Sequence, residues 1–428
     1  MRRPALAVDE SDFRKLWAGD VVSQVGSQIT VLALPFMAVA TLNASGSQIG
    51  ILQALYTLPF LLVPLPAGVW LERRPLRPTM ISLNLVCAAL VLSVPLASAL
   101  GWIGLAHLYV IAVLGGAATV TSDIAKMSLV PRLVRADRLG AANSRINMGV
   151  AAGVTASPGL AGLLIGVGGA PFALVVDGAT YVFCTAALMS ILQREPLHDR
   201  TNAPRRDIRK EVVVGLRTVF ATPPVRNIAI HASLFNGGIQ LMSVALVVYF
   251  VRELGFSSTA YGTVLFCGGI GAVLGSLAAP ALIRRLGHGP AMLGALAVTV
   301  PAFWVLPAVH GSRGAMIAWC SVALAVGLTG SGVGGVVSVT VRQTLTPKAL
   351  HARMNASFQL MNFGTIPVGA LAGGLLVDRM GAHDTLWVAA AVLVIAVTPL
   401  APRAVRSLGK VLDPTEEDDG SRLPAGQE

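Results

Sequence analysis

The chain has 428 residues, of which 54% are hydrophobic and only 12% are charged, and its mean hydropathy is +0.71. This composition excludes an ordinary soluble protein and is usual for a bundle of helices in lipid. The net charge of +11 does not indicate a nucleic-acid partner, because basic loops that face anionic lipid head groups explain it.

Twelve apolar runs, all without Lys or Arg, follow one another along the chain. A helix across a hydrocarbon core about 30 Å thick needs about 20 residues, which these runs supply. Backbone groups in lipid must be satisfied within the segment, and the runs show no period-2 alternation, so helices are favoured over barrel strands. We therefore predict an all-α membrane protein with twelve transmembrane helices, at 16–42, 48–70, 79–100, 103–122, 146–167, 171–192, 227–251, 259–283, 290–309, 314–341, 354–377 and 385–402.

The basic residues fall almost entirely in alternate gaps between these runs. One set of gaps, together with the two ends of the chain, holds 29 of the 32 Lys and Arg residues, and the other set holds only Arg252, Arg313 and Arg379. By the positive-inside rule, both termini are predicted to be cytoplasmic. Arg outnumbers Lys by 27 to 5, which fits a GC-rich bacterial genome, so we expect a multi-pass protein of a bacterial plasma (inner) membrane.

The two halves of the chain are similar at an offset of 212 residues, which aligns Asn143 with Asn355 and Gly169 with Gly381. A six-helix bundle that occurs twice is a pattern of transporters. The segment between the halves is hydrophilic, and part of it has apolar residues at every fourth position, as an amphipathic helix on the membrane surface does. The predicted domains are an N-terminal bundle over 1–192, a cytoplasmic linker with an amphipathic helix over 193–226, a C-terminal bundle over 227–403 and a disordered tail over 404–428.

The loop after the second predicted span resembles the major facilitator superfamily. The family pattern is Gly-x-Leu-x-Asp-Arg-x-Gly-Arg-Lys/Arg, from which Pro75 and Leu76 depart, and the residues that match it in kind are Gly68, Glu72, Arg73 and Arg77. The resemblance implies the major facilitator fold, with two pseudo-symmetric six-helix bundles. It also implies a conformational latch, in which the acid lies near a helix N-terminus of the other half and the basic residues pair with Asp123. Charges that only set the topology are the alternative.

The fifth predicted span is similar to a motif of proton-linked exporters in this superfamily, Gly-x-x-x-Gly-Pro-x-x-Gly-Gly. Small residues at this spacing let helices approach closely, and the proline lets the helix bend. Short matches around Asn143 and Asp177 also resemble the branch that contains enterobactin and macrolide exporters. The resemblance implies export rather than uptake, and the residues that carry the motif are Gly153, Ser157, Pro158, Ala161 and Gly162.

Amide side chains occupy matching positions of the first and seventh predicted spans. At the offset of 212 residues, Gln24 aligns with Asn236 and Gln28 with Gln240. A polar stripe on a helix in lipid faces a cavity or a neighbouring helix. Positions near mid-membrane, where two repeats meet, are where transporters bind substrate. We predict that these four amides line the substrate cavity, and hydrogen bonds that only hold helices together are the alternative.

Asp20 and Asp177 are the only acidic residues well inside the predicted spans. A lone carboxylate is costly to keep ionised in hydrocarbon, so it is a candidate for taking up and releasing protons as a cavity opens to either side. Asp20 shares its stripe with Gln24 and Gln28 and is the first candidate for proton coupling. Asp177 is the second, with structural hydrogen bonding as the alternative. The arginine that the superfamily's fourth-span motif places near Ile111 is missing here.

Nothing in the sequence indicates an enzyme, a cofactor site or a metal site. The glycine clusters lie inside apolar spans without the Lys-Ser/Thr ending of a phosphate loop, and no nucleophile or metal-ligand set has a recognisable spacing. We predict a monomeric secondary active transporter that contacts membrane lipids and no nucleic acid. By resemblance, it would export an amphipathic small molecule, such as a drug, antibiotic or siderophore, in exchange for protons. Uptake or lysophospholipid-type lipid transport by the same fold, and a non-transporting membrane scaffold or sensor, are alternatives.

Overall fold

The computed structural model describes residues 10–192, 208–347 and 350–401, and all regular elements in these ranges are helical. Part of the predicted linker, 193–207, and the predicted disordered tail, 404–428, lie outside the described residues. The all-α prediction is therefore confirmed for the described part of the chain.

The first half of the chain begins with a long helix and a broken one. The second span bends by 48° at Val63, because Pro64, which follows it, has no N–H to donate to the preceding turn and its ring crowds the carbonyl there. Its start is fixed by a capping box, in which the Ser45 and Gln48 side chains accept each other's backbone N–H. The helices of this half are α1 (Glu10–Ala40), α2 (Gly46–Leu62), α3 (Pro64–Leu71), α4 (Leu76–Ala99), α5 (Leu105–Leu133), the short 3-10 helix Ala136–Arg138, and α6 (Leu139–Met189).

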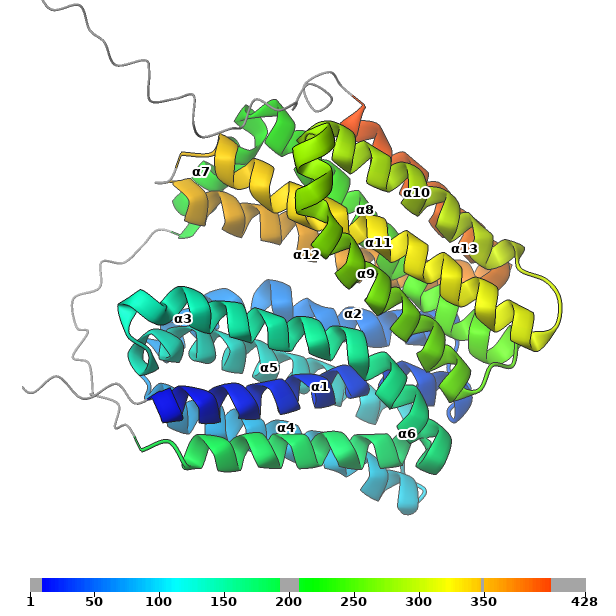
Figure 1. The fold of residues 1–428 in the computed structure, drawn as a ribbon. Coiled ribbons are helices and arrows are strands. Elements are labelled where there is room, and N and C mark those ends of the chain that lie inside the picture. Colours follow the sequence, from blue (N-terminus) through cyan, green and yellow to red (C-terminus); the bar gives the residue numbers. More distant parts are fainter. Residues whose placement is uncertain (1–9, 193–207, 348–349, 402–428) are drawn as a thin grey trace, which may run out of the picture.

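Helix α6 consists of two membrane spans joined at one glycine. A straight helix of its 51 residues would be about 75 Å long, more than twice the thickness of a hydrocarbon core. At Gly169 the backbone has φ 78° and ψ 172°, a conformation that is essentially restricted to glycine. The chain turns there, and the two parts of α6 run in different directions (Figure 1).

The second half begins with a short amphipathic helix, α7, which packs on α12 next to Gly215. Single glycines with positive φ also join two pairs of spans here, Gly287 (φ 84°) between α9 and α10, and Gly381 (φ 86°) between α12 and α13. The helices are α7 (Ile208–Ala221), α8 (Pro223–Val248) with its π-helical end η2 (Tyr249–Glu253), α9 (Ser258–Leu286), α10 (His288–Ala308), α11 (Arg313–Leu345), α12 (His351–Met380), α13 (Ala382–Val397) and the 3-10 turn Thr398–Leu400.

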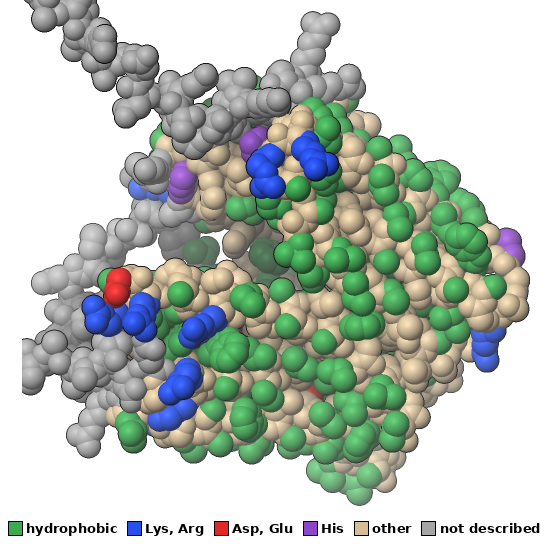
Figure 2. Space-filling model, in the orientation of Figure 1, with side chains coloured by type: hydrophobic (Ala, Val, Ile, Leu, Met, Phe, Trp, Pro, Cys, Tyr) green, Lys and Arg blue, Asp and Glu red, His purple; other side chains and the backbone are tan. Residues whose placement is uncertain are grey.

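The predicted number of membrane spans agrees with these helices. Ten helices of the described part are long and apolar enough to cross a membrane, and the broken pair α2–α3 is an eleventh. Since α6 contains two spans, the described residues hold twelve. Many large apolar side chains are exposed on the outer surface of the bundle, as Figure 2 shows, which is expected where helices face lipid.

The helices form two groups that lie side by side (Figure 1). We call the end of the bundle where α1 begins the linker end, and the opposite end, where the turn 41–45 joins α1 to α2, the far end. The main contacts between the two halves are α2 with α12 and α6 with α9. One large cluster of buried apolar side chains runs through both halves, and a smaller one lies in the first half only.

Candidate functional site

The two halves are in closest contact toward the far end. A Cβ atom on Gly50 of α2 would lie 2.5 Å from the carbonyl oxygen of Ala370 on α12. One on Gly162 of α6 would lie 2.8 Å from Cα of Gly262 on α9. Toward the linker end the halves diverge, and Figure 2 shows a hollow between them. The structure is therefore closed at the far end and open at the linker end.

A cavity of about 230 Å³ lies between the two halves, where these contacts end. Its walls are mostly apolar, with Leu32, Leu52 and Leu265 among the lining residues. The polar groups are amides and hydroxyls, from Gln28, Gln53, Tyr56 and Thr57 in the first half and Gln240, Ser243 and Tyr261 in the second. None of the described residues that line this cavity carries a charge. Such a site binds a molecule by shape, apolar contact and a few hydrogen bonds.

The structure divides the four predicted cavity amides into two pairs. Gln28 and Gln240 line the cavity, and the Gln240 amide donates to the side chain of Gln53 across the two halves. Gln24 lies against Gly153 of α6 and is outside the cavity lining. Asn236 donates to Asn362 of α12 at 3.0 Å, so it joins two helices within one half. This is the alternative given above, a hydrogen bond that holds helices together.

A cluster of three charged side chains lies on α1 and α5. The Lys126 ammonium donates to Asp20 at 2.7 Å and to Asp123 at 2.8 Å. Lys126 and Asp20 are largely buried, with 8% and 13% of their side chains exposed, whereas Asp123 is 38% exposed. The expectation that Asp20 is a lone carboxylate is therefore wrong. The fourth span continues to Leu133, well beyond the apolar run, so Lys126 belongs to it and not to a loop.

Asp177 is fully buried on the second part of α6. Its carboxylate accepts from the hydroxyl of Thr30 on α1 and, at 3.1 Å, from that of Thr180 on its own helix. A hydrogen bond between Ser27 and Tyr181, at 2.9 Å, also joins the two helices. Asp177 therefore helps to hold α1 against α6, inside the first half.

The predicted latch residues lie at the linker end of α3 and α4. Glu72 and Arg73 are exposed, and no atom lies close to the position of a Cβ on Gly68. Arg77 donates to the carbonyls of Leu188 (2.8 Å) and Met189 (2.7 Å) at the end of α6. The acid that the sequence assigns to these basic residues, Asp123, accepts from Lys126 instead. A latch that closes the linker end is expected to be released in this conformation, so it stays a prediction.

The exporter-like motif lies where α6 contacts two other helices. Gly153 lies against Gln24 of α1, and the buried Ser157 donates to the carbonyl of Val25 at 3.0 Å. Pro158 and Gly162 face α9 of the other half, where they lie against Gly262, and Ala161 is fully buried. The small residues therefore allow α6 to fit between α1 and α9.

Several residues of the site were not predicted, although the sequence carries a signal for some of them. Gln53, Tyr56 and Thr57 occupy positions i, i+3 and i+4 of an otherwise apolar run, the spacing of one helix face. Lys126 follows Asp123 by three residues, which places them on the same face. Among the described residues, no group of three or more His, Cys, Asp and Glu side chains is placed to hold a metal ion.

A helical bundle of two similar halves, with a cavity between them that opens at one end only, has the architecture of a membrane transporter. The family model of the Major Facilitator Superfamily matches residues 16–370. The chain belongs to this superfamily, which confirms the resemblance seen in its motifs, and it is a transporter and not an enzyme.

Named relatives include two exporters. The chain is 30% identical over 381 residues to the multidrug efflux pump Tap of Mycolicibacterium fortuitum, covering 84% of this chain and 88% of that protein. It is 27% identical over 256 residues to the enterobactin exporter EntS of Escherichia coli, covering 59% of this chain and 58% of that protein.

A solved structure shows the same fold. A bacterial homologue of the iron transporter ferroportin in its inward-facing state has a TM-score of 0.72 at 18% identity, and the match covers 92% of this chain and 98% of that one. The outward-facing state of a bacterial ferroportin homologue gives a TM-score of 0.56.

Proposed function

We propose that this protein exports an amphipathic small molecule by alternating access, in exchange for protons. The observation that carries the proposal is the cavity between the halves, which combines apolar walls with uncharged hydrogen-bonding groups from both halves. A molecule with one apolar face and a few polar groups fits such a site. The exporter-like motif on α6 and the two exporters among the relatives support export over uptake.

The linker end is proposed to face the cytoplasm of a bacterial cell. Most basic residues lie in the gaps that meet at this end, and Figure 2 shows basic side chains gathered there on both halves. By the positive-inside rule, the open cavity then receives substrate from the cytoplasm or the inner leaflet. One chain supplies both halves of the cavity, so a monomer surrounded by membrane lipids suffices for transport.

The topology can be checked directly. Reporter fusions after residue 200 are expected to read cytoplasmic, and fusions near Gly255, in the turn between η2 and α9, are expected to read external. Topology reporters that are active on one side of the membrane only make this measurement. The opposite result would invert the sides and with them the direction of transport.

The charged cluster on α1 and α5 is the proposed site of proton coupling. When Asp20, Asp123 and Lys126 are all ionised, the cluster has one net negative charge. An uncompensated charge is costly when the site loses access to water, and the uptake of one proton removes it. A cycle in which the cluster takes up a proton from outside while the linker end is closed, and releases it to the cytoplasm after the linker end has reopened, would carry a proton inward. Asp177, fully buried in the first half, is the second candidate.

Loss of the two bridging amides is expected to slow export strongly. In the Gln53→Leu/Gln240→Leu variant both partners are replaced together, so no amide is left without its partner, and the cost in stability is small. We expect the variant to reach the membrane at the parent's level but to lose roughly tenfold or more of the export rate. The assay is the cellular accumulation of amphipathic antibiotics, dyes and a catecholate siderophore in a host without its own major efflux pumps.

The matched control is Gln343→Leu, the same substitution at an exposed position near the linker end of α11. It is expected to export like the parent. If the parent does not lower the accumulation of any compound in the panel, export of this class of amphipathic molecule is ruled out. If the parent raises accumulation, the protein is an importer.

A further inference from the structure

Two charged side chains of the second half contact the first half at the far end, one at the start of α2 and the other at the turn that joins α1 to α2. Asp378, near the end of α12, accepts from the backbone N–H groups of Gly46 (2.6 Å) and Ser47 (2.9 Å), and from the Ser47 hydroxyl. Arg252, in η2, donates through Nη2 to the carbonyl of Ala44 at 2.7 Å. Both contacts cross from one half of the molecule to the other.

Each charge lies at the helix end that suits its sign. The first N–H groups of a helix have no partner within the helix, and together with the helix dipole they favour an anion. The Asp378 carboxylate occupies this position at the start of α2. The last carbonyls of a helix favour a cation, and the Arg252 guanidinium also lies 3.4 Å from the carbonyl of Val39 in the last turn of α1. Charge-assisted hydrogen bonds of this kind are among the stronger ones in proteins.

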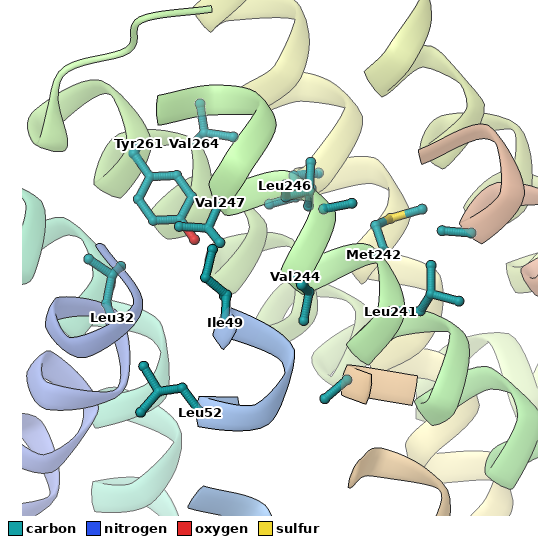
Figure 3. Close-up of a cluster of buried hydrophobic side chains, with 14 of the residues drawn as sticks. Leu32, Ile49, Leu52, Leu241, Met242, Val244, Leu246, Val247, Tyr261 and Val264 are labelled. Carbon is teal, nitrogen blue, oxygen red and sulfur yellow. The ribbon is translucent and has the colours of Figure 1, made fainter. Parts of the chain in front are cut away.

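Close packing of α2 on α12 brings the carboxylate to the helix end. A Cβ atom on Gly46 would lie 2.6 Å from Cγ1 of Val377, so only glycine fits there without a shift. Three residues further along α2, Ile49 is fully buried and points across to Val247 of α8, close to Tyr261 of α9 (Figure 3). The two charged contacts therefore lie next to a group of buried apolar side chains that also comes from both halves.

The sequence around Asp378 has the spacing of the pattern that the loop after α3 only approximates. Residues 374–381 read Gly-Leu-Leu-Val-Asp-Arg-Met-Gly, which matches Gly-x-Leu-x-Asp-Arg-x-Gly at every specified position. In the first half this element stands at the linker end with Glu72 as its acid, whereas in the second half it stands at the far end. Here its acid is observed on a helix N-terminus of the opposite half.

We propose that Asp378 and Arg252 form a latch, the far-end latch, which holds the two halves together at the far end while the linker end is open. Both contacts join groups that separate if the far end opens, so the latch stabilises the observed conformation and must be released in each transport cycle. The proposal rests on alternating access, and it is independent of the substrate and of the coupling ion.

The accessibility of one cavity residue tests the far-end latch without a transport assay. Ser243→Cys places a thiol in the cavity lining, and a membrane-impermeant maleimide added to whole cells reaches it only when the far end opens. We expect slow labelling in the otherwise unchanged protein and labelling about tenfold faster with Asp378→Asn or Arg252→Gln, since hydrogen bonds to a charged group shift an equilibrium by about that factor or more.

Two matched variants control for the change of charge. Asp384 contacts His383 at 3.0 Å, and Arg313 donates to the carbonyl of Gly255, so both contacts stay within the second half at the same end. Asp384→Asn and Arg313→Gln are expected to label as slowly as the parent. Equal labelling rates in the latch variants and these controls would overturn the proposal.

Misfolding and inverted topology give different results. Three of the native cysteines, Cys87, Cys184 and Cys320, are buried, so a misfolded variant labels even without Ser243→Cys. If Asp378→Asn misfolds in this way, the labelling rate of Arg252→Gln tests the latch instead. Asp378→Glu keeps the charge, so it should label more slowly than Asp378→Asn. In inside-out vesicles, the protein that carries Ser243→Cys as its only change should be labelled rapidly through the open linker end. Slow labelling there, with rapid labelling of whole cells, would instead refute the proposed orientation.

Discussion

Inverted membrane vesicles that contain the Asp20→Asn variant are expected to bind substrate but to lose its accumulation under an imposed pH gradient. In the parent, Asp20, Asp123 and Lys126 together have one net negative charge when ionised, with Lys126 2.7 Å from Asp20. The asparagine keeps the size of the side chain but makes the cluster neutral without a proton. With one proton exchanged per molecule, a gradient of one pH unit supports about tenfold accumulation, and this is the effect that the variant should lose.

The control is Asp137→Asn, which removes an acid at the same end of the molecule. Asp137 is 62% exposed and pairs with Arg135, so its variant should accumulate substrate like the parent. If Asp20→Asn behaves like this control while Asp177→Asn loses accumulation, the coupling acid is Asp177. If both variants accumulate substrate normally, transport is not coupled to protons through either acid.

Gly162→Ala is expected to destabilise the observed conformation, although alanine is the better helix former. The new Cβ atom would lie 2.6 Å from the carbonyl oxygen of Ser258 and 2.8 Å from Cα of Gly262. Both are backbone atoms, so α6 and α9 must move apart. Overpacking of this kind costs about 1–3 kcal/mol. We expect a lower melting temperature of the purified protein and faster labelling of Ser243→Cys from outside, because the helices that must separate close the far end.

Gly115→Ala is the matched control, since Gly115 lies within α5 and no atom outside its own helix turn approaches its Cβ position within 4 Å. There the substitution should keep the melting temperature or raise it, because alanine gains up to about 1 kcal/mol over glycine in a helix interior. Equal melting temperatures of the Gly162→Ala and Gly115→Ala proteins would show that the contact of α6 with α9 yields easily and does not hold the far end closed.

The fold was largely predictable because two strong signals do not depend on side-chain packing. Hydrocarbon imposes its length on each span, and the repeat at 212 residues aligns Gly169 with Gly381, which both prove to be single-residue joints with φ of 78° and 86°. The limits of the helices were less predictable. Helix α5 extends to Leu133, because helices continue into the interfacial region where charged side chains reach water or partners, and hydropathy falls before the helix ends.

The site was predictable only in part, because a polar residue in a span has two possible uses. Gln28 and Asn236 look equivalent in the sequence, yet Gln28 lines the cavity whereas Asn236 bonds to Asn362 on a neighbouring helix. Which use applies depends on the residues across the helix contact, more than a hundred positions away in the chain. The ion pair of Asp20 with Lys126 was missed for the same reason, since it joins two helices that hydropathy treats separately.

The single-glycine joints extend the effect of each conformational change to the surrounding membrane. A joint of one residue allows little relative movement of the helices on either side. We therefore expect the two parts of α6, α9 with α10, and α12 with α13 each to move as one stiff pair. The inner members of these pairs contact the opposite half, while the outer ones present exposed apolar side chains, such as Phe183, Val298 and Ile395, to lipid. A displacement at the centre is thus carried to the lipid boundary, where deforming the bilayer has an energetic cost. We therefore expect the transport rate to depend on the thickness and stiffness of the membrane.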